Sequence, residues 1–579
     1  WTLAALYLRL VLGHPHSTPL LPPQILVMTF TDAATAELRA RIRTRLSQAA
    51  TYFDWSAQGR ECPKSLEVDG FLKQLRDDFD ASDWPRCALQ LHCAAEWMDD
   101  AAIYTIHGWS RRMLTQHALE SHNLFKQTRL DNAEQLKLTL VQDYWREWFY
   151  PLSADTLAHI TPLIGHEPAQ LLTTLSDIWR EQERKPRNLT PPDVTPTQAI
   201  QAHLDWQAEV DASAHAARAT WSDAVWQALQ TAIENKTIHG RGITGPNLRK
   251  WADALQTWAE QEAPVKTDWL RRFTTTELQT NGWADAEGFG FFAQLQDHVT
   301  LLDNPPDTHT HMALHAAHAV GEAYAQTKAQ RAAFDFSDLL ENLYHAVMAD
   351  DGRLASAIRQ QYPVALVDEF QDTDPWQYGT LHRIYAPDAC TPANALVMIG
   401  DPKQAIYSFR GADLGTYLQA RKDAQNVNND ALHTLTGNHR SNEGLVKAVN
   451  HVFTQIRQPF ASAQGDIEFV EVSAQSKEPP LTINNQAHPS LTVWHMPPEG
   501  DADTVGMVNY RYGMAHVLAD HMAQLLNQGD ASPSDMAVLV RSQTQADAVR
   551  QALREYQIPS VYLSDHTNVY HSTEATDLW

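Results

Sequence analysis

The sequence predicts an α/β protein in which a parallel sheet is interrupted by a large all-helical insertion. Short apolar runs end abruptly in polar or charged residues, most clearly at Val364–Val367, which is typical of buried strands in a parallel sheet. Between about residues 130 and 325 strand-like runs are scarce, tryptophan, glutamine, alanine and histidine are frequent, and prolines cluster near 185–196 and 305–306. That composition indicates helices.

Length and composition set the broad class of the protein. The chain has 579 residues, too many for one hydrophobic core, so we expect about three or four domains. No apolar run approaches the ~18 residues of a membrane span, and we expect no membrane contact. The four cysteines are scattered without a CxxC pair, which argues against a disulfide framework or a zinc or iron–sulfur site and fits a reducing compartment.

The formal net charge of −25 lowers the expectation of non-specific DNA binding. It does not exclude DNA, because a binding groove needs only local basicity.

Both ends of the chain suggest a piece of a longer protein. Thr2–Leu12 is apolar nearly all round and predicts a buried helix, with no strand or cap before it. Residues 578–579 fall inside what reads as another helix.

The first strand is predicted at residues 24–31, followed by a helix with Asp32 as its N-cap. This helix carries the most basic short stretch of the chain, which a solvated helix face explains as well as a binding surface does. Its basic residues are Arg39, Arg41, Arg43 and Arg45. Residues 101–107 form another short strand-like run, followed by a helix through residues 108–114.

After the insertion, the amphipathic residues 334–348 begin the return to the sheet, and a strand at 395–399 follows. A helix is predicted at about 442–456. Residues 460–535 are expected to be strand and loop, with the best strand at 491–495. The strand–helix–strand order at 536–540, 543–555 and 559–563 then predicts a second α/β unit.

The candidate chemistry centres on the stretch that follows the strand Val364–Val367. Asp368 and Glu369 come directly after it, at the edge where open α/β sheets bind their ligands. Two adjacent acids can divide the work of nucleotide hydrolysis, one holding Mg²⁺ through water and the other orienting or deprotonating the attacking water. Taken alone, the pair is more simply explained as a solvated acidic turn.

Five short stretches, taken together, favour the nucleotide-hydrolysis interpretation over the acidic turn. They are TFTDAATAELRARI at 29–42, TIHGWSRRML at 105–114, VDEFQDTDPWQ at 367–377, IGDPKQAIYSFRGAD at 399–413 and LTGNHRS at 435–441. In this order they resemble the motifs of superfamily 1 DNA helicases of the UvrD/Rep type. The chain is more similar still to the RecB family, the beta subunits of exodeoxyribonuclease V. That likeness rests on AALYLRLVLG, FDFSDLL, RSQTQADAVRQAL and IPSVYLSD, and it is weakest between about 130 and 320.

The resemblance implies RecA-like parallel-sheet motor domains. The first motor domain would comprise residues 1–130, lacking the phosphate loop, and residues 321–435, with the DEFQDTD and GDPKQ motifs. Residues 131–320 would be the helical insertion and 436–579 the start of a second RecA-like motor domain. Because the family's Gly-Lys-Thr loop is missing, we expect residues 1–579 alone not to hydrolyse ATP efficiently.

The resemblance also implies an ATP site with Mg²⁺. Asp368 resembles the magnesium-associated acid and Glu369 the water-activating base. Gln404 resembles a glutamine that senses the γ-phosphate, and Arg440 an arginine that reaches it from the second motor domain. His439 stands where relatives carry an aromatic residue that stacks on adenine.

A path for single-stranded DNA is implied by the same likeness. It would offer hydroxyl groups, rings on which bases stack, phosphate contacts, and an arginine that serves the DNA backbone or couples the two sites. The residues are Thr29, Phe30, Thr31, Thr105, His107, Tyr407, Phe409 and Arg410.

The function implied is that of an ATP-dependent 3′→5′ DNA helicase subunit in the bacterial cytoplasm. It would act with RecC-like and RecD-like subunits in a heterotrimeric helicase–exonuclease that processes double-strand DNA ends in recombinational repair. The alternatives are a stand-alone UvrD/Rep-type repair helicase, an AddA-type helicase–nuclease, and a catalytically inactive DNA-binding scaffold subunit.

Overall fold

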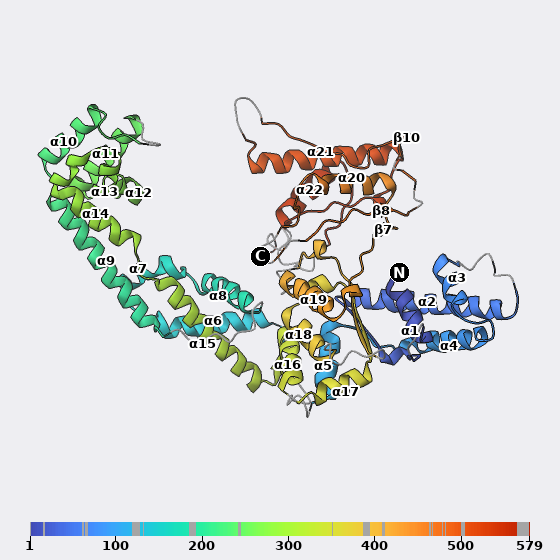
Figure 1. Ribbon diagram of the computed structural model, residues 1–579. Coiled ribbons are helices and arrows are strands. Elements are labelled where there is room, and N and C mark those ends of the chain that lie inside the picture. Colours follow the sequence, from blue (N-terminus) through green and yellow to red (C-terminus); the bar gives the residue numbers. More distant parts are fainter. Residues whose placement is uncertain are drawn as a thin grey trace. The chain divides into compact units, whose positions relative to one another are not determined.

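The structure is a computed structural model of the chain (Figure 1). It describes residues 2–14, 18–60, 63, 68–118, 128–130, 132–183, 193–240, 245–349, 351–385, 394–407, 412–461, 465, 467–476, 479–480, 482–498, 504–563 and 578. The chain divides into two compact units, unit 1 (Trp1–Asp423) and unit 2 (Ala424–Trp579). The predicted boundary between the motor domains, at 435/436, lies a little beyond this division, and the domain assignments stay predictions.

A four-stranded parallel sheet forms the core of unit 1 (Figure 1). Its strands are β1 (Ile25–Thr29), β2 (Ile103–Thr105), β5 (Val364–Val367) and β6 (Ala395–Met398), in the order β2-β1-β5-β6. Met28 stands opposite Val367, and Val367 stands opposite Met398. Because all four strands run parallel, their carboxyl ends meet at one edge. All four strands predicted for this unit are confirmed.

Side chains along the strands alternate between two hydrophobic clusters, as the period of a strand requires. In β1, Ile25 and Val27 join one cluster, whereas Leu26 and Met28 join the other. The first face is covered by α1 (Thr2–Leu12), α2 (Asp32–Ala57), α3 (Gly70–Asp77) and α4 (Trp84–Glu96). The second is covered by α5 (Ile106–Gln116), α16 (Phe336–Ala349), α17 (Arg353–Gln361), α18 (Pro375–Ile384) and α19 (Leu414–Val427). The predicted α/β class is thereby confirmed.

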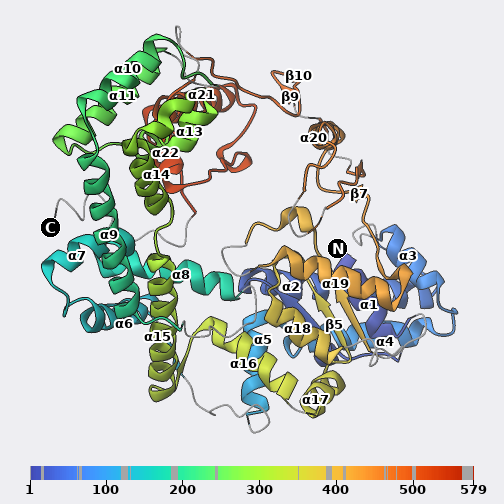
Figure 2. The ribbon, with the colours of Figure 1, turned by 60° about the vertical axis from the view of Figure 1, so that its left-hand side comes forward.

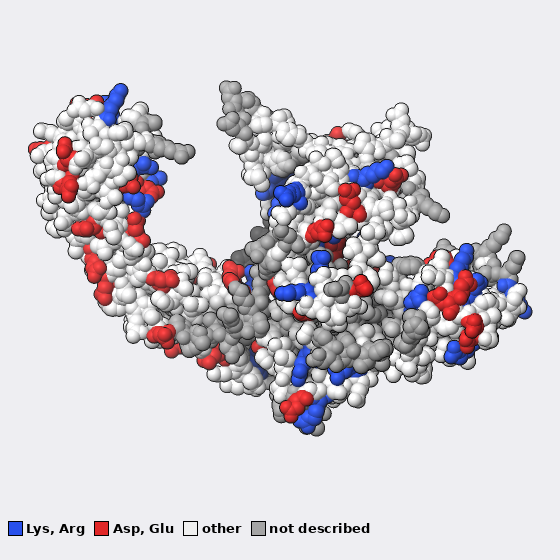
Figure 3. Space-filling view, viewed as in Figure 1, with Lys and Arg blue, Asp and Glu red and all other residues white. Residues whose placement is uncertain are grey.

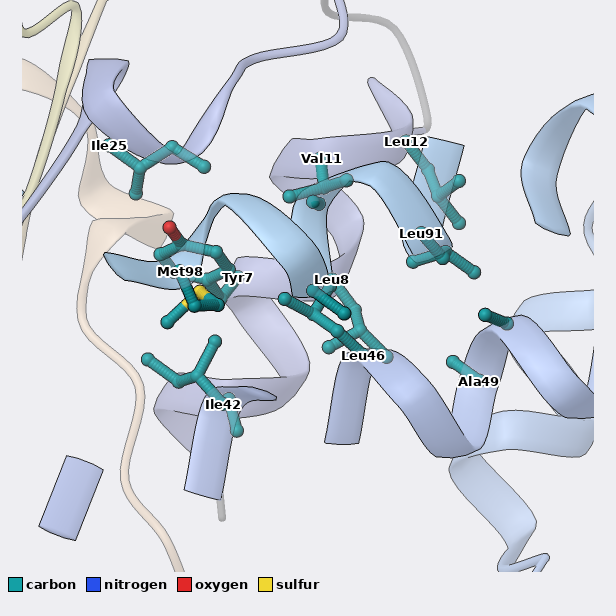
Figure 4. Close-up of a cluster of buried hydrophobic side chains, with 14 of the residues drawn as sticks. Tyr7, Leu8, Val11, Leu12, Ile25, Ile42, Leu46, Ala49, Leu91 and Met98 are labelled. Carbon is teal, nitrogen blue, oxygen red and sulfur yellow. The ribbon is translucent and has the colours of Figure 1, made fainter. Parts of the chain in front are cut away.

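Helix α1 is buried, as its sequence predicts. Tyr7 and Leu8 are fully enclosed and belong to the same cluster as Ile42 and Leu46 of α2. Figure 4 shows Tyr7 beside Met98, and Leu8 beside Leu46. Burying a side chain of this size stabilises the fold by roughly 1.5–3 kcal/mol, so α1 is an integral part of the layer that supports the sheet.

The helical insertion, residues 132–330, leaves and rejoins the sheet domain through two paired segments. β3 (Thr128–Arg129) pairs in parallel with β4 (Ala333–Phe334). The helices between them, seen in Figure 2, are α6 (Ala133–Trp148), α7 (Ala154–Ile164), α8 (Pro168–Glu183), α9 (Pro196–Ala219), α10 (Asp223–Glu234), α11 (Gly245–Gln261), α12 (Thr267–Arg271), α13 (Thr275–Thr280), α14 (Gly290–Asp303) and α15 (Thr308–Gln330). The described residues of the insertion contain no strand.

Two separate hydrophobic cores hold the insertion together. One joins α6 to α9 with α15, and the other joins the end of α9 with α10 to α14. Trp258 and Trp283 lie inside the second core, which fits their predicted role as packing residues. Among the described helices, none is both long and apolar enough to cross a membrane.

Unit 2 contains the helices α20 (Glu443–Thr454), α21 (Met507–Gln528) and α22 (Gln543–Glu555). Short strands β7 (Gly437–Asn438) and β8 (Ser473–Ala474) pair in parallel, and β9 (Thr482–Ile483) and β10 (Gln486–Ala487) pair antiparallel. Helices α21 and α22 share a small alanine-rich core that includes Ala519 and Ala552. The helices predicted at 442–456 and 543–555 are confirmed.

Three strands predicted for unit 2, at 491–495, 536–540 and 559–563, are wrong. These segments have no regular secondary structure and, within the described residues, pair with no neighbouring strand; Leu539 and Leu563 are 97% and 90% exposed. An apolar run becomes a strand only where another strand accepts its hydrogen bonds. Helix α21 was also not predicted, although Gly529 marks its end. That glycine has φ 76° and its N–H donates to the carbonyl groups of Leu525 and Leu526.

Candidate functional site

The carboxyl edge of the parallel sheet brings together the segments that follow its four strands, and each of these segments carries predicted site residues. Backbone hydrogen bonds between neighbouring strands continue beyond the end of β5. The N–H of Asp368 donates to the carbonyl of Met28 in β1 at 2.9 Å, and the N–H of Phe370 donates to the carbonyl of Ile399, just after β6, at 2.9 Å. The loops after β1, β5 and β6 therefore start side by side, about 4.8 Å apart from strand to strand. Strand β2, whose Thr105 stands opposite Thr29, runs directly into α5 at the same edge. Segments distant in the sequence meet here.

Asp368 and Glu369 follow β5 in an unusual backbone conformation. Glu369 has φ 52° and ψ 44°, in the left-handed region that non-glycine residues rarely adopt. Such a conformation costs about 1–3 kcal/mol and persists where surrounding contacts impose it, often at functional sites. The Glu369 side chain is exposed, whereas Asp368 is half-buried. Burial and the neighbouring Glu369 carboxylate raise the pKa of Asp368, so a cation beside it would be favourable.

Gln371 fixes the arrangement of the acidic loop. It lies in η4 (Phe370–Asp372) and is only 2% exposed. Its Nε2 donates to Oε2 of Glu369 at 2.7 Å and lies 3.4 Å from Oδ2 of Asp372. Its Oε1 accepts from the N–H of Asp401, beyond β6, at 2.9 Å. Burial and the Glu369 carboxylate raise the pKa of Asp372 to about 6. Sequence reasoning assigned no role to Gln371.

The loop after β6 is organised around Asp401. The Nζ of Lys403 lies 2.8 Å from Oδ1 of Asp401, and the Lys403 N–H donates to the same oxygen at 3.0 Å. Nε2 of Gln404 donates to Oδ2 at 3.1 Å. Burial acts to raise the pKa of Asp401, but these bonds prevail and lower it. The predicted γ-phosphate sensor, Gln404, is exposed at this edge with its amide bonded to Asp401.

Two predicted DNA-facing aromatic residues meet at this edge. The rings of Phe30 and Tyr407 are stacked, with centroids 5.3 Å apart and an interplanar angle of 27°. Both side chains are partly exposed. A flat aromatic pair at the surface is a suitable platform for nucleotide bases. The predicted residues Phe409 and Arg410 lie outside the described residues.

The two threonines around Phe30 have structural tasks. The hydroxyl of Thr29 is buried and bonds to that of Thr35 at 2.6 Å and to the carbonyl of Thr31 at 3.2 Å. Thr31 is the N-cap of α2, because its hydroxyl accepts from the N–H of Ala34 at 3.1 Å. The prediction that Asp32 caps this helix is wrong, since Asp32 is already its first helical residue. The DNA contacts of Thr29 and Thr31 stay predictions.

Thr105 and His107 stand at the start of α5. The Thr105 hydroxyl caps the helix by accepting from the N–H of Gly108 at 3.2 Å. His107 packs edge-to-face against Phe336, with centroids 5.4 Å apart, and burial lowers the pKa of His107. A neutral imidazole can still donate a hydrogen bond to a phosphate.

Phe336 is 53% exposed and was not assigned by sequence reasoning, although it belongs to the FDFSDLL stretch. The backbone around Phe336 is fixed by a partly buried charged cluster. Asp335 and Asp338 each accept a hydrogen bond from the other's backbone N–H, at 3.0 and 2.8 Å. The Nζ of Lys328, at the end of α15, lies 3.0 Å from Asp335 and 2.5 Å from Asp338. This cluster joins the end of the insertion to the start of α16, so Phe336 is presented from a rigid junction.

Unit 2 holds the remaining predicted nucleotide contacts, His439 and Arg440. Both side chains are exposed. The Oδ1 of Asn438 accepts from the N–H groups of Arg440 and Ser441, each at 2.9 Å, which fixes the turn between β7 and α20.

The arginines of α2 are engaged within unit 1. Arg41 pairs with Glu37 at 2.6 Å, Arg43 with Asp99 at 2.5 Å, and Arg45 with Asp69. Arg39 donates to the carbonyl of Ile103 at 3.1 Å. In Figure 3, acidic and basic side chains are intermixed over α2 to α4. The basic stretch is therefore a paired helix face rather than a uniformly positive surface.

The sequence of the chain is similar to those of known helicases over its whole length. The UvrD/REP helicase N-terminal domain family matches residues 2–425. The RecBCD enzyme subunit RecB of Escherichia coli (strain K12) is 35% identical over 605 residues, which cover 100% of this chain and 48% of that protein. RecB of Haemophilus influenzae is 29% identical over 100% of this chain and 49% of that protein. RecB of Mycobacterium tuberculosis (strain H37Rv) is 34% identical over 48% of this chain. The chain spans about half the length of the first two relatives.

Proposed function

The chain belongs to the UvrD/REP helicase family, and from this premise we propose that the intact protein is an ATP-dependent DNA helicase of the RecB type. The observation that carries the proposal is the meeting, at one sheet edge, of an acidic pair after β5 with a stacked aromatic pair from the loops after β1 and β6. One pair suits nucleotide hydrolysis and the other suits single-stranded DNA.

Glu369 is the proposed general base. Its exposed carboxylate stands beyond the end of β5 in a strained conformation, held by the Gln371 amide. In phosphoryl transfer such a group orients and deprotonates the attacking water. Gln404 would reach the γ-phosphate after releasing Asp401. His439 and Arg440 of unit 2 would contribute an adenine contact and a positive charge for the transferring phosphoryl group.

Asp368 is the proposed Mg²⁺ ligand. Among the described residues there is no cluster of three or more histidine, cysteine, aspartate or glutamate side chains that could hold a metal ion. Mg²⁺ commonly keeps several waters and binds through one or two carboxylates and the phosphates of its substrate. A single half-buried carboxylate whose pKa is raised by burial and by Glu369 fits that mode of binding. When bound, the ion would neutralise charge on the phosphates.

DNA would be held at the same edge by stacking and by contacts to its backbone. Phe30 and Tyr407 offer their ring faces, which bind bases with little sequence preference. Thr105 and His107 at the start of α5 suit phosphate contacts, and the exposed Phe336 beside His107 extends the aromatic surface. Thr29, Thr31, Phe409 and Arg410 complete the proposed set.

The finer assignments rest on the relatives. These relatives are named RecBCD enzyme subunit RecB, that is, as one subunit of a larger enzyme. We assign to this protein RecC-like and RecD-like partners, 3′→5′ movement, exonuclease activity on double-strand DNA ends, and a bacterial cytoplasmic location.

An unwinding assay tests the proposal. The intact protein, alone and with the products of its neighbouring genes, is given ATP, Mg²⁺ and duplexes with a 3′ tail, a 5′ tail or blunt ends. We expect unwinding of 3′-tailed duplexes by the protein alone and of blunt ends by the complex. Preference for the 5′ tail would refute the polarity, and the absence of ATP-dependent unwinding from every substrate would refute the helicase function.

A further inference from the structure

Gln371 is the only described side chain that bonds both to Glu369 and to the loop after β6. It donates to the Glu369 carboxylate at 2.7 Å and accepts from the N–H of Asp401 at 2.9 Å. These two groups lie in loops that follow different strands. Only a side chain with both a donor and an acceptor can make this bridge, and an amide does so without adding charge beside the carboxylates.

The Gln371 side chain, which forms this bridge, is tightly packed. Gln371 is 2% exposed. A Cβ added to Gly400 would lie 2.6 Å from Oε1 of Gln371 and 3.0 Å from the N atoms of Phe370 and Gln371. Close packing of this kind transmits displacement, since tightly packed elements shift together rather than deform.

The far side of the bridge leads to the aromatic pair. Asp401 donates its N–H to Gln371 and uses its carboxylate to hold Lys403 and Gln404 in η6 (Pro402–Gln404). Three residues further on, Tyr407 stacks on Phe30. A base that enters between these rings must move Tyr407, Phe30 or both, and movement of Tyr407 acts on the short loop that begins at Asp401.

We propose that Gln371 is a positioning residue that makes the placement of Glu369 depend on DNA bound at Phe30 and Tyr407. The inference rests on the proposed function, and it names how that function is regulated. DNA binding shifts the 401–407 loop, Gln371 follows Asp401, and the Glu369 carboxylate moves into line with its water. Without DNA, Glu369 stays poorly placed and hydrolysis is slow.

The test measures ATP hydrolysis by the intact protein with and without oligo-dT. Gln371→Met keeps the length of the side chain but removes both hydrogen bonds, whereas Gln371→Glu keeps the acceptor and loses the donor. Gln377→Met is the matched control, because Gln377 is also buried, at 7% exposed, and no bond joins it to Glu369 or Asp401. We expect both Gln371 variants to lose about tenfold in stimulation by DNA, as supporting residues of catalytic groups commonly do, with KM for ATP within about twofold of wild type. The control should keep its stimulation.

Hydrogen exchange supplies a readout that does not depend on turnover. In the wild type, oligo-dT should slow exchange in peptides that cover residues 29–35 and 368–372. In Gln371→Met only the first peptide should respond, because DNA still binds but its effect no longer reaches Glu369.

The outcomes separate this inference from the proposed function. If the wild type is stimulated by DNA and Gln371→Met retains that stimulation, only the inference is overturned. It is also overturned if basal and DNA-stimulated rates fall by the same factor, since that marks a merely structural residue. If the wild type itself neither hydrolyses ATP nor responds to DNA, the proposed function fails and the inference with it.

Discussion

Replacing Gly400 with alanine should disturb the site without touching any of its proposed reactive groups. The new Cβ would lie 2.6 Å from Oε1 of Gln371 and 3.0 Å from two backbone nitrogens, so the Gln371 side chain has to move. Overpacking of this kind costs about 1–3 kcal/mol. Loss of the bond to the Asp401 N–H adds about 1–2 kcal/mol, because a partly buried donor is left without its acceptor.

We therefore expect Gly400→Ala to lower the free energy of unfolding of unit 1 by about 2–5 kcal/mol, measured by urea denaturation. Gly290→Ala is the matched control, since a Cβ there meets nothing within 4 Å and Gly290 is the first residue of α14. The control should unfold like the wild type. A loss below about 0.5 kcal/mol for Gly400→Ala, the range of neutral surface changes, would refute the packing argument.

Three further predictions follow from single contacts. Phe30→Ala should weaken binding of single-stranded DNA by about 1–3 kcal/mol through loss of a stacking face; an unchanged Kd in fluorescence anisotropy would count against the platform. Asp372→Asn should stabilise the protein at pH 7 by on the order of 1 kcal/mol after allowance for solvent screening. The pKa of Asp372 in the folded state, about 6, lies above its unfolded value, so the folded state holds this proton more tightly and the stability of the wild type falls as pH rises from about 4 to 6. Below about pH 4 Asp372 is protonated in both states, so Asp372→Asn should there be no more stable than the wild type. A stabilisation by asparagine that does not depend on pH would contradict this. Thr31→Val should cost about 1 kcal/mol as a lost N-cap, and Asp32→Ala less, because it only weakens the interaction of an acidic side chain with the helix dipole. A loss in thermal unfolding that is as large for Asp32→Ala as for Thr31→Val would contradict Thr31 as the sole cap.

The two central strands of the unit 1 sheet, β1 and β5, could be predicted because both are buried on both faces, so that each reads as a continuous apolar run. β5 reads Val364–Val367 in the sequence and is buried at every position in the structure. The apolar runs at 536–540 and 559–563 did not form strands. A strand also needs a neighbouring strand to bond to, and the residues within a run do not show whether such a neighbour is present. Helix α21 was missed because apolar residues such as Met507, Val508 and Val517 lie on its exposed surface, so its sequence lacks a clear apolar stripe.

The candidate site likewise has some features that could be predicted from the sequence and others that could not. Asp368, Glu369, Phe30 and Tyr407 could be proposed from their motifs, and the parallel sheet brings their loops to one edge. The bridge made by Gln371 could not be foreseen, because it joins residues about thirty positions apart through one side-chain conformation. The choice between Thr31 and Asp32 as cap also depended on geometry alone, since both residue types cap helices well.

The proposed role of Glu369 is to activate the water that attacks ATP in a DNA-driven motor. Its most direct test compares the intact wild-type protein with Glu369→Gln, measuring ATP hydrolysis at saturating single-stranded DNA and binding of ATP in parallel. We expect kcat to fall by about 100-fold or more, the usual contribution of a general base, while ATP and DNA still bind. Hydrolysis by Glu369→Gln at the wild-type rate would contradict it.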